Sequence, residues 1–369
     1  AAILLFTMHV LLAFFLLPLA LALRACDEDE RLSHPVLCSK VEQVLHNPQE
    51  VSSELHAWAK QHNLLVGSEL TPAIGLVQKR RLGASSSSSG GIPVVMAHGM
   101  GDSCFNDGMQ HVVQHISDLL GGVYSTCVPT GDNHQEDTSS GYFLNMDASV
   151  DVFAQKVRDD PKLQNGFKAI GFSQGNNVIR GYIAKYNDPP VKVFISVNGV
   201  NGGEGAVPYC RPSLLESASV EFSMCDLLME QASNAAYTSY SQEHSFQANY
   251  WRDPRASEFP TYQKFAQLAV WNNEGIGGVN QTLNDNWSKT DTFVWVLATG
   301  DGMVWPKEGE QWGAPDPKDP FQTILSREDT AWFQQDLFGL RTAEEAGKNH
   351  YESFDGDHLQ FDWDDFDGW

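Results

Sequence analysis

The chain has 369 residues, 42% of them hydrophobic, which suits one large domain, with or without an inserted lobe. It carries 47 Asp and Glu against 24 Lys and Arg, a formal net charge of −23. That charge repels phosphate backbones and anionic membranes, so it argues against a nucleic-acid-binding protein and against electrostatic docking on lipid.

The N-terminal segment is an apolar run through Leu23 with small residues at Ala22 and Ala25. We expect residues 1–25 to be a signal peptide, cleaved near Cys26, that directs the chain to a lysosomal or secreted, lumenal location. The run is also long enough to span a bilayer, so an uncleaved anchor is the alternative.

Sequons and cysteines fit a lumenal environment. Two sequons, at Asn280 and Asn286, are candidate glycosylation sites. The six cysteines are an even number, as expected in an oxidising compartment, although sequence alone does not fix their pairing. The candidate pairs are Cys210 with Cys225, which would close one loop, and, as guesses, Cys26 with Cys38 and Cys104 with Cys127.

Residues 26–91 form a polar N-terminal extension. It ends in a run of serines, from Ser85 to Ser89, that is flanked by glycines. Such a composition is typical of a flexible linker. We therefore begin the main domain at Ile92, so that it spans residues 92–369.

From Ile92 onward, short apolar runs alternate with amphipathic stretches. Strands are expected at 92–97, 167–172, 191–197 and 293–299, and helices at 109–120 and 176–186. Strands separated by helices predict an α/β fold, with a parallel sheet between two layers of helices. Between about 201 and 290 this pattern breaks, and the stretch fits a lid-like inserted lobe over the C-terminal edge of the sheet.

A nucleophile motif follows the strand expected at 167–172. Residues 171–175 read Gly-Phe-Ser-Gln-Gly, which has the form G-x-S-x-G. Small residues around Ser173 allow the sharp strand-to-helix turn that projects a serine hydroxyl outward. The expected helix after the motif supports Ser173 as a nucleophile, and a glycine turn with an ordinary serine is the alternative.

A serine nucleophile needs a base and an acid. In proteins that carry this motif, the order along the chain is serine, then acid, then histidine. His358 lies near the C-terminus, where the histidine belongs, and His350 is its competitor. Asp301 comes directly after the strand expected at 293–299 and would orient the imidazole of His358. Because Asp-Gly is a common turn pair, a plain turn aspartate is the alternative for Asp301.

A glycine-rich segment, His98 to Ser103, follows the first expected strand. Glycines let the backbone approach a substrate closely. The amides of Met100 and Gln174 are the candidate donors of an oxyanion hole. The alternative is a glycine-rich turn that binds no ligand.

Several segments resemble the palmitoyl-protein thioesterase family and occur in the family's order. They are HGMGDS at 98–103, YFLN at 142–145, DPKLQNGFKAIGFSQG at 160–175, YWRDP at 250–254, QDLFGLRTAEEAGK at 335–348 and GDHLQ at 356–360. The resemblance implies an α/β-hydrolase that removes palmitoyl groups from S-acylated cysteines of proteins or peptides during lysosomal degradation, with acyl-CoA as a further candidate substrate. Ser173, Asp301 and His358 match the family's triad, and Met100 and Gln174 match its oxyanion positions.

The chain also departs from the family. The Cys-Cys pair usual after the glycine-rich segment is Cys104-Phe105 here, and two further family cysteines are replaced by Ala154 and Tyr186. The end of the chain, from Phe361 to Trp369, is acidic and aromatic where the family has an apolar helix. These departures concern the disulfides and the terminal packing, and they leave the triad intact.

A long acyl chain requires an apolar groove. Each buried methylene contributes about 0.8 kcal/mol, so a sixteen-carbon chain gives on the order of 10 kcal/mol before the costs of binding. We expect much of the groove in the inserted lobe, and packing within the lobe's own core is the alternative for each lining residue. The candidates are Phe222, Met224, Leu227, Leu228, Tyr237, Tyr240 and Phe246.

Neither a metal nor a cofactor is expected, because the sequence has no C-x-x-C or H-E-x-x-H motif. Two other functions are weighed against the thioesterase. One is a lumenal lipase or carboxylesterase on the same fold. The other is a catalytically silent relative that binds lipid or protein.

Overall fold

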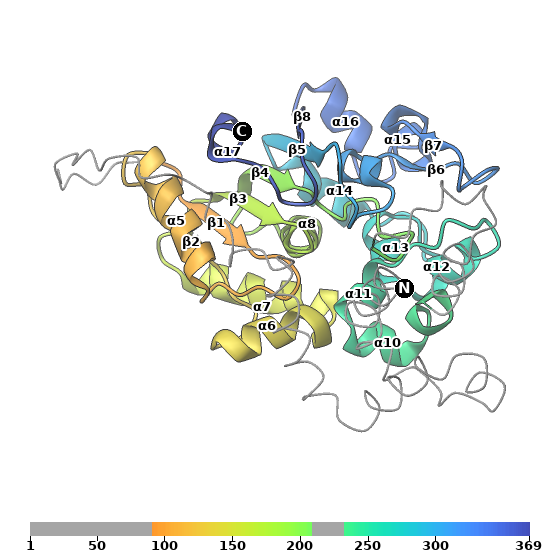
Figure 1. Cartoon of the computed structure of the whole chain (residues 1–369), viewed down its shortest axis with the longest axis horizontal. Helices are drawn as coiled ribbons and strands as arrows, with labels where there is room; N and C mark the ends of the chain where they lie inside the picture. The colour runs from red at the N-terminus through yellow and green to blue at the C-terminus, as the bar shows by residue number, and fades with distance from the viewer. Residues whose placement is uncertain (1–90, 209–231) are drawn as a thin grey trace, which may run out of the picture.

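The computed structural model describes residues 91–208 and 232–369, and its centre is a six-stranded sheet (Figure 1). The strand order is β2-β1-β3-β4-β5-β8, and every neighbouring pair is parallel. The strands are β1 (Val94–Ala97), β2 (Ser125–Cys127), β3 (Phe167–Phe172), β4 (Val191–Val197), β5 (Thr292–Ala298) and β8 (Asn349–Phe354). The carboxyl ends of these strands therefore meet at one edge of the sheet.

Helices connect the strands and cover both faces. Those before β4 are α5 (Asp107–Leu119), α6 (His134–Phe143), α7 (Met146–Asp159) and α8 (Gly175–Lys185). After β5 come η2 (Lys307–Gln311), the small strands β6 (Ala314–Pro315) and β7 (Ile324–Leu325), η3 (Arg327–Asp329), α15 (Ala331–Gln334), α16 (Leu340–Glu345) and, after β8, α17 (Trp363–Gly368). None of the helices in the described parts of the chain has the length and apolar character needed to cross a bilayer.

Alternate residues of each strand belong to two different cores. On β5, Trp295 belongs to the core that contains α7 and α8, whereas Val294 and Val296 belong to the core that contains α5 and α17. Successive side chains of a strand point to opposite faces, so a sheet covered on both sides needs apolar residues at almost every position. The prediction of an α/β fold with a parallel sheet between helices is confirmed.

Short helices make up much of the described part of the segment between β4 and β5. Figure 1 shows α10 to α13 grouped on the side of the sheet away from α5. The bounds are α10 (Ser239–His244), α11 (Phe246–Tyr250), α12 (Phe259–Phe265), α13 (Gln267–Trp271) and α14 (Gln281–Ser288). A bridge between Glu204 and Trp251 ties the start of this segment to the end of α11. We call the segment from 201 to 290 the lobe.

The expected elements match the structure to within two residues at each end, and β3 and β4 match at both ends. Strands β2 and β8 and helices α6 and α7 were not expected. The proposed signal peptide at 1–25, the extension at 26–90 and the pair Cys26–Cys38 lie outside the described residues.

Candidate active site

The turn between β3 and α8 holds Ser173 in a conformation that few L-residues adopt. Its φ is +50°, in the left-handed region. A Cβ at Gly171 would collide with the side chain of Asn176, and one at Gly175 would collide with the carbonyl of Ala97. Both flanking glycines are therefore required by close packing, and this backbone strain at a serine is typical of a functional turn.

The three predicted site residues come together at the carboxyl edge of the sheet. His358 Nε2 lies 2.8 Å from Ser173 Oγ, and His358 Nδ1 lies 2.6 Å from Asp301 Oδ2. Ser173 follows β3, Asp301 follows β5 and His358 follows β8, so a different strand positions each residue. The competitor His350 is exposed near the start of β8.

Asp301 is held as an anion. Its Oδ1 accepts hydrogen bonds from the backbone amides of Met303 and Val304 at 2.7 and 2.8 Å. Burial alone would raise the pKa of Asp301, but the charge of His358 and its hydrogen bond to Asp301, together with the backbone amide of Val304, lower this pKa below its ordinary value. An ionised Asp301 can fix the orientation of the imidazole.

Two polar residues beside the triad were not predicted, because no motif marks them. Asn198, directly after β4, donates from Nδ2 to Glu310 Oε2 at 2.8 Å. Its Oδ1 accepts from the backbone amide of Leu359 at 3.0 Å, next to His358. Both side chains are fully buried.

The segment after β1 lies against the nucleophile turn, as the contact between Gly175 and the carbonyls of Ala97 and His98 requires. Its Met100 amide and that of Gln174 donate no hydrogen bond to another group within residues 91–208 and 232–369. Two backbone N–H groups on neighbouring segments that make no other hydrogen bond suit an oxyanion hole. Their catalytic role stays a prediction.

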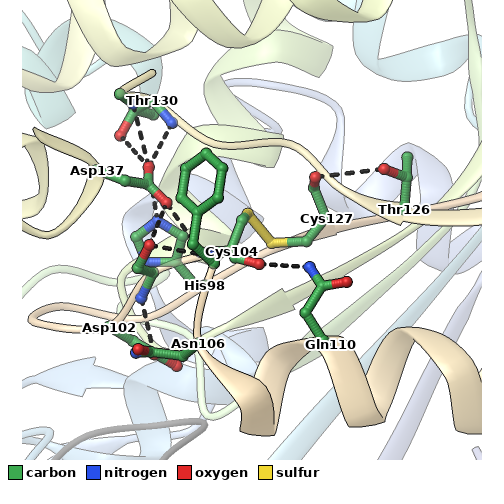
Figure 2. Close-up of a disulfide and its surroundings, with 12 residues drawn as sticks. His98, Asp102, Cys104, Asn106, Gln110, Thr126, Cys127, Thr130 and Asp137 are labelled. Carbon is green, nitrogen blue, oxygen red and sulfur yellow. Dashed lines mark hydrogen bonds and ion pairs between the residues drawn. A yellow bond between two sulfur atoms is a disulfide. The ribbon is translucent and has the colours of Figure 1, made fainter. Parts of the chain in front are cut away.

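Figure 2 shows how a buried polar cluster supports this segment. His98 Nε2 lies 3.2 Å from Asp137 Oδ1, and His98 Nδ1 lies 2.9 Å from the carbonyl oxygen of Gly99. Burial alone would lower the pKa of His98, but its hydrogen bond to Asp137 and the charge of Asp137 raise it to about 9. His98 is therefore an imidazolium at neutral pH, and both of its ring nitrogens donate.

The same cluster includes a disulfide. Cys104, directly after the segment, pairs with Cys127 at the end of β2, as one of the guessed pairings had it (Figure 2). Asp137 also accepts from Ser103 Oγ and from the backbone amide of Cys104, at 2.9 and 2.8 Å. The other proposed pair, Cys210 with Cys225, lies outside the described residues.

The lobe contacts the nucleophile turn through Gln174. The Nε2 atom of Gln174 donates to the carbonyl of Gly141 at 2.7 Å, and its Oε1 accepts from Gln247 and from Tyr250 on α11. The motif singles out Gln174 for its backbone amide, whereas the structure shows that its side chain also anchors the lobe.

The described candidates for the acyl groove lie in three different environments. Tyr237 is buried and bonded to the backbone of Trp251, within the lobe's core. Phe246 is buried beside a small cavity that Gln174 also lines. Tyr240 is 41% exposed and stacks on His244, so it lies on the surface. The remaining candidates, Phe222, Met224, Leu227 and Leu228, lie outside the described residues.

The two sequons differ in exposure. Asn280 is exposed at the start of α14. Asn286 is only 6% exposed, and its Nδ2 donates to the carbonyl of Ala184 at 3.0 Å. A glycan is attached through Nδ2 and must reach solvent, so the structure corrects the expectation for Asn286 and leaves Asn280 as the suitable site.

Two groups of side chains in the described residues are spaced closely enough to hold a metal ion. In one of them, Cys104 is already committed to the disulfide. In the other, His358 already bridges Ser173 and Asp301. In each group, therefore, at least one donor atom is already engaged in a protein contact.

Comparison with known proteins identifies the family. The model of the palmitoyl protein thioesterase family matches residues 93–358. The chain belongs to this family. Palmitoyl-protein thioesterase 1 of Caenorhabditis elegans is 34% identical over 73% of this chain and 87% of that protein. Palmitoyl-protein thioesterase 3 of Dictyostelium discoideum is 28% identical over 69% and 81%, and the human lysosomal thioesterase PPT2 is 24% identical over 68% and 76%. Family membership and fold together make the chain a hydrolase.

Proposed function

We propose that this chain is a serine thioesterase that hydrolyses long fatty acyl groups, palmitoyl above all, from S-acylated cysteines of proteins or peptides. The observation that carries the proposal is the unbroken hydrogen-bonded chain from Ser173 through His358 to Asp301. It occurs in a member of the palmitoyl-protein thioesterase family, at the sheet edge where such hydrolases carry their triad.

The first half of the proposed reaction forms an acyl-enzyme. His358 takes the proton of Ser173 as Oγ attacks the thioester carbonyl. The carbonyl oxygen becomes an anion against the amides of Met100 and Gln174, and one such donor is worth roughly 3 kcal/mol. The C–S bond then breaks, and the sulfur leaves readily because a thiol has a pKa of about 8.5. The leaving thiolate takes the proton from the His358 imidazolium, which makes His358 a neutral base again for the second half.

The second half returns the free enzyme. His358 takes a proton from water, and the hydroxide attacks the acyl ester on Ser173. The tetrahedral intermediate collapses to a free fatty acid, and Ser173 Oγ regains its proton from the imidazolium. An oxygen leaving group is poorer than a thiolate, so we expect deacylation to be the slower half.

His98 supports the proposed oxyanion hole electrostatically. Its Nδ1–H donates to the carbonyl of Gly99, in the same peptide unit as the Met100 amide. A cation that polarises this peptide unit makes its N–H a stronger donor. The positive charge of His98 therefore assists the anion without touching it.

The place of action is part of the proposal. An N-terminal signal peptide, a glycan on Asn280 and the disulfide between Cys104 and Cys127 would all suit a lysosomal or secreted enzyme. S-palmitoylated proteins and peptides are its proposed partners, and acyl-CoA is a further candidate substrate with the same thioester.

The test compares two substrates and two proteins. Release of thiol from a palmitoyl-cysteine peptide is measured for the wild type and for Ser173→Ala, beside the oxygen-ester analogue. The proposal predicts thioester cleavage that the Ser173→Ala variant loses. Faster cleavage of the oxygen ester would favour a lipase or carboxylesterase, and no Ser173-dependent cleavage of either would favour a binding protein.

A further inference from the structure

We propose that Glu310, as a neutral carboxylic acid, donates a hydrogen bond to Asp301 and so extends the triad into a four-residue chain that stays active at acidic pH. This role rests on the proposed function of the triad. Glu310 touches neither the substrate nor Ser173 and would act through Asp301, so it is a positioning residue.

The surroundings of Glu310 leave one of its oxygens free for Asp301. Glu310 lies in η2 and is fully buried. Its Oε2 accepts from Asn198 Nδ2 at 2.8 Å and from the backbone amide of Ala298 at 3.0 Å. Its Oε1 has no acceptor bond from another group of the described residues. Carboxyl oxygens of Glu310 and Asp301 and a ring nitrogen of His358 lie within 4.8 Å of one another.

Two buried carboxyls whose oxygens lie this close do not both ionise readily, because each negative charge disfavours the other. Asp301 is the better anion, since it accepts from two backbone amides and from His358. Glu310 accepts only neutral hydrogen bonds, and no Lys or Arg pairs with it within the described residues. The shared proton therefore resides on Glu310.

The charged groups around the pair agree with this assignment. The buried ones are Asp301, His358 and a second acid, Glu204, which accepts from the backbone amides of Trp305 and Ala206. Asp357, beside His358, accepts from the backbone amides of Gly302 and His358. Burial, followed by the charge of Asp301, raises the pKa of Glu310 well above its ordinary value. Lys307 lines the same pocket as Asp301, but it donates to the backbone carbonyl of Thr299 and forms no ion pair with these acids within the described residues.

The other carboxyl oxygen of Glu310, Oε2, is linked to the loop of His358 through Asn198. Glu310 Oε2 orients the side chain of Asn198 by accepting its Nδ2–H. The Oδ1 atom of Asn198 then accepts from the backbone amide of Leu359 and so fixes the loop that carries His358. Asn198 has a φ of +47°, a strained conformation that the surrounding hydrogen bonds maintain. One carboxyl group thus holds both the acid and the base of the triad.

The donated hydrogen bond changes the electrostatics of the triad. An ionised Asp301 that accepts a hydrogen bond from Glu310 presents less negative charge to the imidazolium than a buried carboxylate without that donor. Loss of the donor would strengthen the attraction between Asp301 and the imidazolium, and the activity of such a variant should therefore fall at acidic pH. Glu310 therefore suits an enzyme that works in an acidic compartment.

The experiment measures kcat/KM for a palmitoyl-cysteine peptide against pH in the wild type, Glu310→Gln and Glu310→Leu. The glutamine amide both donates and accepts hydrogen bonds. The acidic limb of the pH profile of Glu310→Gln should therefore stay within about 0.3 pH units of the wild-type limb. Leucine removes the donor, and the acidic limb of the profile should move up by about 1 to 2 pH units. This is the pKa change that corresponds to losing one hydrogen bond to a charged group. Glu352→Leu, at an exposed position on β8, is the matched control and should not shift.

Two results would overturn the proposal. If Glu310 were ionised, Glu310→Gln would remove a negative charge and move the acid limb down by about one pH unit. If Glu310 were only structural, Glu310→Gln and Glu310→Leu would lower kcat/KM by a constant factor at all pH values. Should the leucine variant fail to fold, as judged by circular dichroism, the glutamine variant alone decides between these outcomes.

An infrared difference spectrum of wild type minus Glu310→Gln gives a readout that needs no activity. At pH 7 it should contain the carbonyl stretch of one protonated carboxyl group, and absence of that band would contradict the assignment. If the wild type cleaves no thioester while the band is present, the proposed function fails and the protonation of Glu310 stands.

Discussion

His98, on the segment after β1, and Asp137, on α6, form a buried ion pair with 3.2 Å between Nε2 and Oδ1. The pair fastens the candidate oxyanion segment to a helix that lies 39 positions later in the sequence. Asp137 also accepts from the backbone amides of Thr130 and Gly131, at 2.6 and 3.1 Å, so one carboxylate organises two loops. The loop geometry of the site therefore depends on charge as well as on glycine.

Asp137→Asn should lower the free energy of unfolding by about 3 to 5 kcal/mol at pH 6, because it leaves the His98 charge buried without its partner. The pKa of His98 rises from 6.5 to about 9 on folding, so the pair's stabilisation is full below pH 6.5 and is lost as the pH rises through 9. Urea denaturation at several pH values measures the difference between the two proteins, which should shrink from pH 6 to pH 10.

The control for this prediction is Asp367→Asn, which breaks a partly exposed pair with His115 on the surface. It should change the free energy of unfolding by less than about 1 kcal/mol. A difference between wild type and Asp137→Asn that stays constant from pH 6 to pH 10 would mean that His98 is not the charged partner.

Gly175→Ala should destabilise the protein by about 1 to 3 kcal/mol and reduce thioester cleavage. The new methyl group would meet the carbonyls of Ala97 and His98 and push the nucleophile turn away from the segment that carries Met100. Gly277→Ala is the matched control, because nothing lies within 4 Å of a Cβ at that position. Thermal unfolding and kcat are measured for both, and equal effects would show that close packing at Gly175 is unimportant.

The C-terminal helix α17 supports the nucleophile turn from the second core. Phe366 is buried and lies with its ring centroid 6.0 Å from that of Phe172, the residue before Ser173. Phe366→Ala should therefore cost about 3 to 5 kcal/mol in urea denaturation. Ile276→Ala, at a position 77% exposed, should have little effect. A tolerated Phe366→Ala would imply that α17 is dispensable for the fold.

The central strands and the triad are predictable from sequence because their signals are local. The run Val191–Val197 is mostly apolar and rich in β-branched residues. It forms β4, which begins and ends at the predicted residues. Ser173 stands in a motif whose glycines the turn requires, and Asp301 and His358 follow strands in the expected order.

Other parts carry weak or no local signal. Strand β2 has three residues, and β8 (Asn349–Phe354) is a polar edge strand with mostly exposed or partly exposed side chains. The contact between Asn198 and Glu310 joins residues 112 positions apart, and only the folded sheet brings them together. Asn286 forms a valid sequon, yet burial removes it from solvent, which no sequence pattern records.

Trapping the acyl-enzyme would show whether Ser173 is the nucleophile of a thioesterase. Wild-type protein is mixed with excess palmitoyl-cysteine peptide and quenched in acid within the first turnovers, and its peptides are analysed by mass spectrometry. We predict a burst of released thiol and a palmitoyl group on the peptide that contains Ser173, both absent in Ser173→Ala. A linear release of thiol that persists in Ser173→Ala, with no acylated peptide, would contradict it.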